Sequence, residues 1–402
     1  MIWTTKKLGE LLILSDPGIW GLPINKSGEG VFVLRSTNIL EDGSLDFSEI
    51  AERKVEDDKI NNLYLQNGDI LLEKSGGGPE QPVGRVAYFM APDNQKYIFS
   101  NFIQRLRPKI NLINSRFLFF YLFYIYKTGL TQKFQSQTTG IRNLNLKLYF
   151  NIKIPVPPLT IQQKIVERLD EIRKAQELND KQIELAEELF QSLLHRELDP
   201  KGKNWEVKYL REICKIKGGK RVPKGEHLLD IKTDHPYIRV IDFKDFSVDL
   251  SNLKYINQKI FEKIKDYIVR EDDIYISIAG TTGLVGIIPK ILDGANLTEN
   301  AAKLIIERKN EIDKWYLVYF LFSNYGQNQI RISTYAPGVP KLALYRLEKI
   351  KIPLPPLETQ QKIVEKLSAV QEYKKKLLER KQKLQELFES VLDKSFKGEL
   401  AE

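Results

Sequence analysis

The sequence of 402 residues has one cysteine, Cys214, and three histidines. A single cysteine excludes a disulfide framework and a thiolate metal cluster. The histidines, at positions 195, 227 and 235, do not have the spacing of metal ligands. We therefore expect no metal site and a reducing environment.

Targeting and membrane signals are also absent. Residues 1–14 lack the basic, apolar and small-residue order of a secretory signal. The most apolar run, residues 117–125, is too short to span a bilayer. These absences predict a cytoplasmic protein without a membrane partner.

Phosphate-loop and hydrolase motifs are missing as well. A Walker loop needs Gly-Lys followed by Ser or Thr, but Arg221 follows Gly219-Lys220, and Cys214 stands where the first glycine belongs. The glycine-rich stretch 280–286 leads into apolar, β-type residues, which favours a tight turn between strands. No Gly-x-Ser-x-Gly elbow is present.

Glu206 and Lys208 resemble part of an acidic nuclease site of the Glu-x-Lys kind. The equivalent stretch of the first half, residues 4–6, lacks the acid. An edge strand that opens a second domain explains the pair better. We find no catalytic constellation, so we predict a protein that is not an enzyme and needs no cofactor.

The remaining composition is that of an ordinary globular protein, with 42% hydrophobic and 29% charged residues. Lys and Arg exceed Asp and Glu by 62 to 53, which gives a net charge of +9. This balance permits a polyanionic partner such as nucleic acid but does not require one, because a solvated lysine-rich surface has the same signature.

One segment occurs twice. Residues 152–169 read IKIPVPPLTIQQKIVERL and residues 350–367 read IKIPLPPLETQQKIVEKL, with fourteen of eighteen positions identical at an offset of 198. This offset is far longer than a solenoid repeat of roughly 20–50 residues. Weaker sequence similarities occur in the same order through both halves. The chain is therefore a duplication at the scale of domains, and both halves should share one fold.

Short β-branched and aromatic runs predict strands near residues 30–35, 69–73 and 83–89, and near 237–241, 273–279 and 284–288. Apolar spacings of three and four predict helices at 115–127 and 313–325. Each globular part is therefore expected to be α+β, with antiparallel strands favoured over a wound βαβ sheet.

The proline-rich stretch 154–158 cannot lie inside a helix and predicts an extended strut. A long helix with a narrow apolar stripe follows each strut, interrupted at Asn179 and at Lys381. The residues expected to pair the helices are Ile161, Ile165, Leu169, Ile172, Ile183, Phe190, Ile363, Leu367, Val370, Leu377, Phe388 and Val391.

Two such stripes cover one another most simply as an antiparallel coiled coil, because an isolated amphipathic helix needs its apolar face covered. About 35 helical residues at about 1.5 Å each give a rod of about 50 Å. The predicted architecture is pseudo-twofold symmetric: a globular α+β domain at 1–153, a spacer helix at 154–200, a second, similar domain at 201–351 and a second spacer helix at 352–402.

Two similar domains at a fixed separation suit two separated patches of a DNA duplex, whose grooves recur about every 34 Å. Backbone N–H groups of glycine-rich loops can approach phosphates, and Arg, Lys, Asn and Gln can reach base edges. The candidates for DNA contact are Lys74, Ser75, Gly76, Arg85, Gln137, Thr138, Thr139, Arg142 and Asn143, and, in the second domain, Lys220, Arg221, Ser277, Thr281, Thr282, Arg331, Tyr335 and Lys341.

The doubled proline motif resembles that of the specificity subunits of type I restriction–modification systems. The stretches Gly140–Leu144 and Gly338–Leu342 before each motif, and the closing Lys394–Leu400, are also similar to this family. The resemblance implies two target recognition domains that read the halves of a bipartite double-stranded DNA site. It also implies helices that set the unread gap and dock two modification (methyltransferase) subunits and restriction (helicase-nuclease) subunits, which would carry the catalysis.

Two alternatives remain open from the sequence. One is a DNA-cleaving or DNA-modifying enzyme with a degenerate site, whose activity would depend on Glu206 or Lys208. The other is a coiled-coil protein-binding scaffold that never touches DNA. A binding constant that does not fall with salt would favour this scaffold, because contacts with DNA phosphates release counterions.

Overall fold

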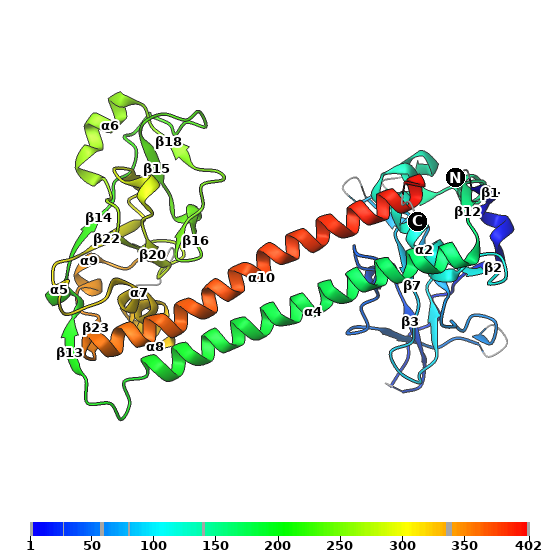
Figure 1. Cartoon of the computed structure of the whole chain (residues 1–402), viewed down its shortest axis with the longest axis horizontal. Coiled ribbons are helices and arrows are strands. Elements are labelled where there is room, and N and C mark those ends of the chain that lie inside the picture. Colours follow the sequence, from blue (N-terminus) through cyan, green and yellow to red (C-terminus); the bar gives the residue numbers. More distant parts are fainter. Residues whose placement is uncertain are drawn as a thin grey trace. The chain divides into compact units, whose positions relative to one another are not determined.

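The computed structural model describes residues 3–26, 28–56, 60–78, 81–138, 141–334 and 340–399. The chain forms two compact units. Figure 1 labels the helices and strands along the ribbon. Unit 1 comprises residues 1–180 and 380–402, and unit 2 comprises residues 181–379. We call residues 3–156 the first head and residues 206–354 the second head.

The largest sheet of each head has four antiparallel strands in the same spatial order. The order is β2-β9-β5-β7 in the first head and β14-β22-β19-β20 in the second. Their bounds are β2 (Leu12–Pro17), β5 (Ile70–Glu73), β7 (Val86–Tyr88), β9 (Ile103–Pro108), β14 (Cys214–Gly218), β19 (Ile274–Ser277), β20 (Val285–Ile287) and β22 (Ala301–Ile306). The glycine-rich stretch 280–286 connects β19 to β20 through a turn, as its sequence predicts.

A second sheet of three strands also recurs, as β4-β3-β8 and as β18-β15-β21. The pairs β3–β8 and β15–β21 are parallel, so the expectation of antiparallel strands holds for the main sheets but not here. The bounds are β3 (Val31–Leu34), β4 (Ala51–Arg53), β8 (Tyr97–Phe99), β15 (Pro236–Ile238), β18 (Lys254–Tyr255) and β21 (Asn296–Leu297).

Smaller elements connect these sheets. They are the hairpin β16 (Phe243–Lys244) and β17 (Ser247–Val248), the helices α3 (Leu146–Tyr149), α5 (Leu210–Ile213), α6 (Gln258–Ile264) and α9 (Leu344–Leu347), and the 3-10 turns η1 (Leu8–Leu11), η2 (Ser36–Asn38), η3 (Leu130–Phe134), η4 (Val240–Asp242), η5 (Lys265–Tyr267) and η6 (Lys290–Leu292).

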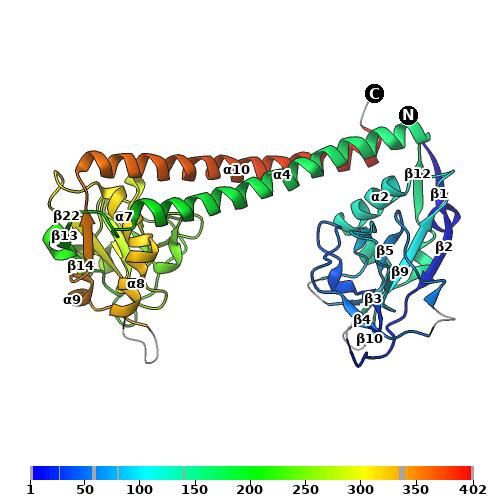
Figure 2. The same ribbon diagram turned by 90° about the horizontal axis from the view of Figure 1, so that it is seen from below.

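One apolar helix lies between the main sheet of each head and the long helices, as Figure 2 shows for α2 (Ser115–Lys127) and α7 (Lys314–Phe322). The helix predicted at 115–127 matches α2. The helix predicted at 313–325 is shorter and is followed by α8 (Asn324–Ser333). Ser323 causes this break, because its backbone is extended and its Oγ accepts the N–H of Gly326 at the start of α8.

The proline segments are extended, as predicted, and each is a paired strand of its own head. β12 (Lys153–Val156) pairs antiparallel with β1 (Thr4–Lys7), and β23 (Lys351–Leu354) pairs with β13 (Glu206–Tyr209). Lys208 on β13 donates to the carboxylate of Glu311 at 2.5 Å. This position agrees with the edge-strand interpretation of residues 206–208.

The two long helices are α4 (Leu159–Leu198) and α10 (Leu357–Lys397). In unit 1, Asp180 of α4 pairs with Lys381 of α10 at 2.9 Å, which gives the interrupting lysine an ionic partner. In unit 2, Glu187 pairs with Lys374 at 2.5 Å and Glu197 with Lys366 at 3.1 Å. Along these pairs the residue numbers on α4 rise while those of their partners on α10 fall. The two helices therefore pack antiparallel, as predicted.

The predicted stripe residues are buried against the heads as well as between the helices. The first head's core contains Ile165, Leu169 and Phe388, with Ile161, Ile172 and Val391 packed at its margin. The second head's core contains Phe190, Ile363 and Leu367, with Val370 at its margin. Leu377 is buried and Ile183 half-buried. Each head core is therefore completed by the beginning of one long helix and the end of the other.

This sharing gives compact units that differ from the four-part division 1–153, 154–200, 201–351 and 352–402. The four-part division remains a prediction about function, in which the helices act as a separate spacer.

Candidate nucleic-acid interface

A three-stranded sheet brings two distant stretches of the first head together. Its order is β10-β11-β6, with β6 (Ser75–Gly77), β10 (Gln135–Thr138) and β11 (Ile141–Leu144). Asn143 lies opposite Ser75, and the Ser75 hydroxyl donates to the Asn143 side-chain oxygen at 2.6 Å. Arg142 lies opposite Gly77, with a register shift between Arg142 and Asn143. We call residues 74–77 and 142–144 the first loop pair.

The second head repeats this junction with the same backbone bond. Leu144 N–H donates to Lys74 C=O at 2.8 Å, and Leu342 N–H donates to Ile278 C=O at 2.8 Å. The two bonds join equivalent positions of the duplicated sequence. We call residues 278–282 and 340–342 the second loop pair.

The second loop pair is held by two further contacts. Ala279 forms an antiparallel bridge with Lys341, and Gly280 N–H donates to Pro340 C=O at 3.1 Å. Thr281 and Lys341 are exposed beside this bridge, and Thr282 is half-buried. The junction therefore presents one hydroxyl and one ammonium group to solvent.

The first loop pair presents a different set of groups. Gly76 is exposed with a φ of 109°, a conformation that L side chains rarely adopt, so the backbone lies open there. Arg142 is half-buried beside it. Burial lowers the pKa of Lys74, which follows β5 directly. The same backbone junction thus carries different polar groups in the two heads.

Two sequence-predicted contacts are placed in the interior instead. Arg85 is 9% exposed and pairs with Glu73 at 2.8 Å, and it also donates to the backbone oxygen of Ile39 at 2.6 Å. Ser277 is fully buried, and its Oγ accepts the N–H of Leu284 at 2.8 Å. Because both side chains are buried and bind internal partners, the prediction that they contact DNA is not supported.

The second head has a further cleft of about 570 Å³, with both polar and apolar residues in its lining. Arg221, Glu299 and Asn300 contribute to its lining. Arg221 is largely exposed and pairs with Glu299 at 2.5 Å. Lys220 is next to it in sequence, with its ammonium 5.5 Å from the Tyr267 ring centre. Arg221 therefore lies at this cleft, whereas Lys220 lies over Tyr267, which is not part of the cleft lining.

Asn300 connects the cleft to the second loop pair. Its carbonyl accepts the N–H groups of Ile278 at 2.8 Å and Ala279 at 3.2 Å. The cleft and the second loop pair therefore share one continuous stretch of backbone.

Among the remaining candidates, Gln137 lies opposite Arg142 where β10 pairs with β11, whereas Arg331 is not part of either loop pair. Arg331 lies on α8, where it donates to Asn328 of the same helix at 3.0 Å. Thr138 ends β10, and only the backbones of Gln137 and Thr138 are described. Thr139 and Tyr335 lie outside the described residues.

Sequence reasoning missed Phe102, which is 44% exposed beside the first loop pair. Its carbonyl accepts the N–H of Lys74 at 2.9 Å, and a Cβ at Gly76 would lie 3.9 Å from its ring. An apolar ring in this position can contact a base or a thymine methyl group. The sequence feature that could have indicated Phe102 is an aromatic residue in a short turn between two strands.

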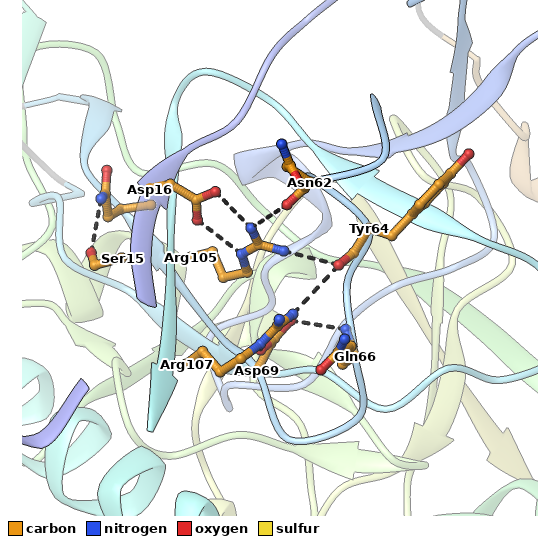
Figure 3. A network of polar contacts seen from close by, with 9 residues as sticks. Ser15, Asp16, Asn62, Tyr64, Gln66, Asp69, Arg105 and Arg107 are labelled. Atoms are coloured by element: carbon orange, nitrogen blue, oxygen red, sulfur yellow. Dashed lines mark hydrogen bonds and ion pairs between the residues drawn. The ribbon is translucent and has the colours of Figure 1, made fainter. Parts of the chain in front are cut away.

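Figure 3 shows a polar network within the first head. Arg105 is fully buried and makes two bonds to Asp16, at 2.9 and 2.6 Å, and one to the backbone oxygen of Asn62 at 2.6 Å. Arg107 pairs with Asp69 at 2.6 Å, just before β5. These contacts fix the strand that leads into the first loop pair.

Comparison with known proteins identifies the family. The sequence profile of the type I restriction modification DNA specificity domain matches the chain twice, at residues 3–188 and 202–387. The chain belongs to this family. Its members are the DNA specificity components of such systems, and the chain is accordingly a specificity component and not an enzyme.

Relatives of this specificity chain support the assignment along its whole length. It is 25% identical over 417 aligned positions to the type I restriction enzyme MjaVIII specificity subunit of Methanocaldococcus jannaschii, covering 98% of this chain and 90% of that one. It is 31% identical over 175 positions to the EcoBI specificity subunit of Escherichia coli, covering 42% of this chain and 36% of that one.

Solved structures share the fold of the specificity chain. One, from a study of complex assembly and conformational transition of the type I R-M system, has a TM-score of 0.63 at 20% identity and covers 99% of this chain and 98% of that one. The type I restriction-modification S subunit of M. genitalium has a TM-score of 0.58 at 15% identity and covers 98% and 96%.

The described residues contain neither a metal-binding cluster nor a membrane-spanning helix. Within the described ranges, no group of three or more His, Cys, Asp or Glu side chains is arranged to hold a metal ion. No helix in the described part of this specificity chain is long and apolar enough to cross a membrane.

Proposed function

We propose that each head of this DNA specificity chain reads one half of a bipartite double-stranded DNA site. The observation that carries the proposal is the repeated loop junction, which has the same backbone bond in both heads but different polar side chains. A common backbone would dock each head on DNA in the same way, while different side chains would select different bases.

The first loop pair offers Arg142 and the open backbone of Gly76. The second offers Thr281 and Lys341, with Arg221 in the adjoining cleft. Guanidinium and ammonium groups favour phosphates and guanine edges. The net charge of +9 supports the same partner.

The long helices would set the unread gap between the half-sites and would dock two methyltransferase subunits and, in the full complex, restriction subunits. Exposed leucines on their outer faces support docking. In unit 1 these are Leu178 and Leu387, 56% and 47% exposed, and in unit 2 they are Leu185 and Leu189, 53% and 51% exposed. Leu185 and Leu189 are four residues apart on α4 and share one face of the helix, so they form an exposed apolar pair that would suit a protein partner. A complex that acts on cellular DNA would work in the cytoplasm.

The test uses the purified chain with its methyltransferase partner on DNA that carries the selected site. A footprint should show two protected half-sites separated by a spacer of constant length. Removing one heptad from both long helices shortens the rod by about 10 Å, which corresponds to about three base pairs. The preferred spacer should change accordingly, and an unchanged spacer would rule out the ruler function.

Salt dependence separates this function from that of a protein scaffold. Binding constants measured between about 50 and 200 mM salt should fall steeply if phosphates are contacted. A binding constant that does not respond to salt would favour the scaffold alternative. Metal-dependent cleavage by the isolated chain, lost in Glu206→Ala, would favour the enzyme alternative.

A further inference from the structure

The two adjacent glutamines of the doubled motif have opposite environments. Gln162 and its counterpart Gln360 are fully buried, whereas Gln163 and Gln361 are exposed. The amide of glutamine has two donor hydrogens and an acceptor oxygen, and burying it is unfavourable unless these groups are bonded. The burial of the same glutamine in both copies therefore indicates a specific set of partners.

In unit 1, Gln162 connects the long helix to two other parts of the first head. Its side-chain oxygen accepts the backbone N–H of Asn114 at 2.7 Å. Its side-chain nitrogen donates to the carbonyl of Pro157 at 2.8 Å, and the carbonyl of Leu112 lies 3.5 Å away. Pro157 belongs to the proline segment that precedes α4.

In unit 2, Gln360 makes the equivalent contacts. Its oxygen accepts the N–H of Asp313 at 2.8 Å, and its nitrogen donates to the carbonyls of Pro355 at 2.9 Å and Glu311 at 2.8 Å. The partner residues differ between the heads, but every partner atom belongs to the backbone. Sequence divergence of the heads therefore leaves this connection intact.

Asn114 and Asp313 are the N-caps of the central helices of the heads. The side chain of Asn114 accepts the N–H groups at the start of α2, and that of Asp313 does the same for α7. The glutamine oxygen accepts the backbone N–H of the cap residue, which is one of the two N–H groups at the helix start that the cap side chain does not bind. One amide thus joins the start of the long helix, the proline segment and the start of the central head helix.

We propose that Gln162 and Gln360 are positioning residues that fix the angle between each head and its long helix, and thereby make the complex select one spacer length. The proposal rests on the ruler function above. α4 has 40 residues and is about 60 Å long. A tilt of about 3° at one end of such a rod moves the other end by about 3.4 Å, the rise of one base pair. Spacer selection therefore needs a stiff joint.

The experiment measures methylation and binding by the full chain with its methyltransferase partner. The DNA series keeps both half-sites constant and varies the spacer from the preferred length by one and two base pairs. Gln→Met variants at positions 162 and 360, singly and together, keep the side-chain length but remove the hydrogen bonds. Gln361→Met and Gln382→Met are the matched controls, because both side chains are exposed. Gln163 is unsuitable as a control, because its side-chain oxygen accepts a hydrogen bond from Asn114 Nδ2 at 3.1 Å.

We expect the double variant to lose at least tenfold of its preference for the correct spacer over spacers one base pair longer or shorter. Discrimination against wrong bases within each half-site should stay within about twofold of the unmodified complex, and both controls should leave spacer preference unchanged. A merely structural role would lower binding to all spacers by the same factor, and that result overturns the proposal.

If the double variant does not fold, each single variant is measured in its place, and threefold or greater relaxation is expected from one joint. An unmodified complex that binds no split site contradicts the ruler function itself. An unmodified complex with a fixed spacer, and variants that keep the same spacer preference, contradict only the role of the glutamines.

Discussion

The end of the second long helix completes the core of the first head, although more than 260 residues separate Phe388 from α2 in the sequence. Phe388 is 7% exposed, and its ring lies 6.3 Å from the rings of Phe120 and Phe123. The guanidinium of Arg173, held over the same group of rings, lies 5.2 Å from the Phe388 ring. We predict that Phe388→Ala destabilises the first head and not the second.

The expected loss follows from these contacts. Removing a buried phenylalanine side chain costs about 3–5 kcal/mol, and the lower end applies at the edge of a core, where neighbours can close the cavity. A loss of about 3 kcal/mol raises the equilibrium population of the opened state by roughly a hundredfold. Arg173 would lose one of its aromatic neighbours, and desolvation already lowers its pKa to about 10.

The assay is hydrogen exchange in the full chain, followed separately in peptides from α2 and from α7. Leu387→Ala is the matched control, because its side chain is 47% exposed and its removal should cost no more than about 0.5 kcal/mol. Exchange in α2 should accelerate strongly in Phe388→Ala while exchange in α7 stays the same. Equal exchange in α2 for Phe388→Ala and Leu387→Ala would refute the shared-core reasoning.

Three further predictions concern single side chains. Burial raises the pKa of Cys214 from 9.0 to about 12, so at pH 8 its reaction with a disulfide reagent should be about a thousandfold slower in the native chain than after unfolding; an equally fast native reaction would contradict its burial. Arg105→Met should lower the free energy of unfolding by about 3 kcal/mol in urea titrations, since it leaves Asp16 and two backbone oxygens without their buried donor; a change below about 1 kcal/mol would contradict the network. Arg142→Ala and Lys341→Ala should each weaken DNA binding by about 1–3 kcal/mol at low salt; unchanged anisotropy titrations for both would remove the loop pairs from the interface.

The duplication and the long helices could be predicted from the sequence because their signals are local and repeated. The α2 helix matches its predicted range, since apolar positions at three and four spacings dominate residues 115–127. The parallel pairs β3–β8 and β15–β21 could not be predicted in the same way, because short strands carry no signal of their partner's direction.

The backbone of the candidate site could be predicted in part, and its contact with DNA stays a prediction. Loop composition correctly indicated polar, glycine-containing loops, but burial of individual side chains depends on distant partners. Arg85 resembles an available DNA-binding arginine in the sequence, yet Glu73, twelve residues earlier, lies across the β5–β7 pair and binds it. The burial of Gln162 could not be predicted from the sequence either, because the adjacent Gln163 is the same residue type and only the fold distinguishes the two.

The most direct test of separate reading by the two heads is to determine the bound DNA sequence twice. Fragments selected from random DNA by the chain with its methyltransferase partner are sequenced, first for the unmodified chain and then for a Thr281→Ala, Thr282→Ala variant of the second loop pair. We predict that one half-site changes or becomes degenerate, while the other half-site and the spacer stay the same. A change in both half-sites, or one uninterrupted recognition sequence for the unmodified complex, would contradict the account.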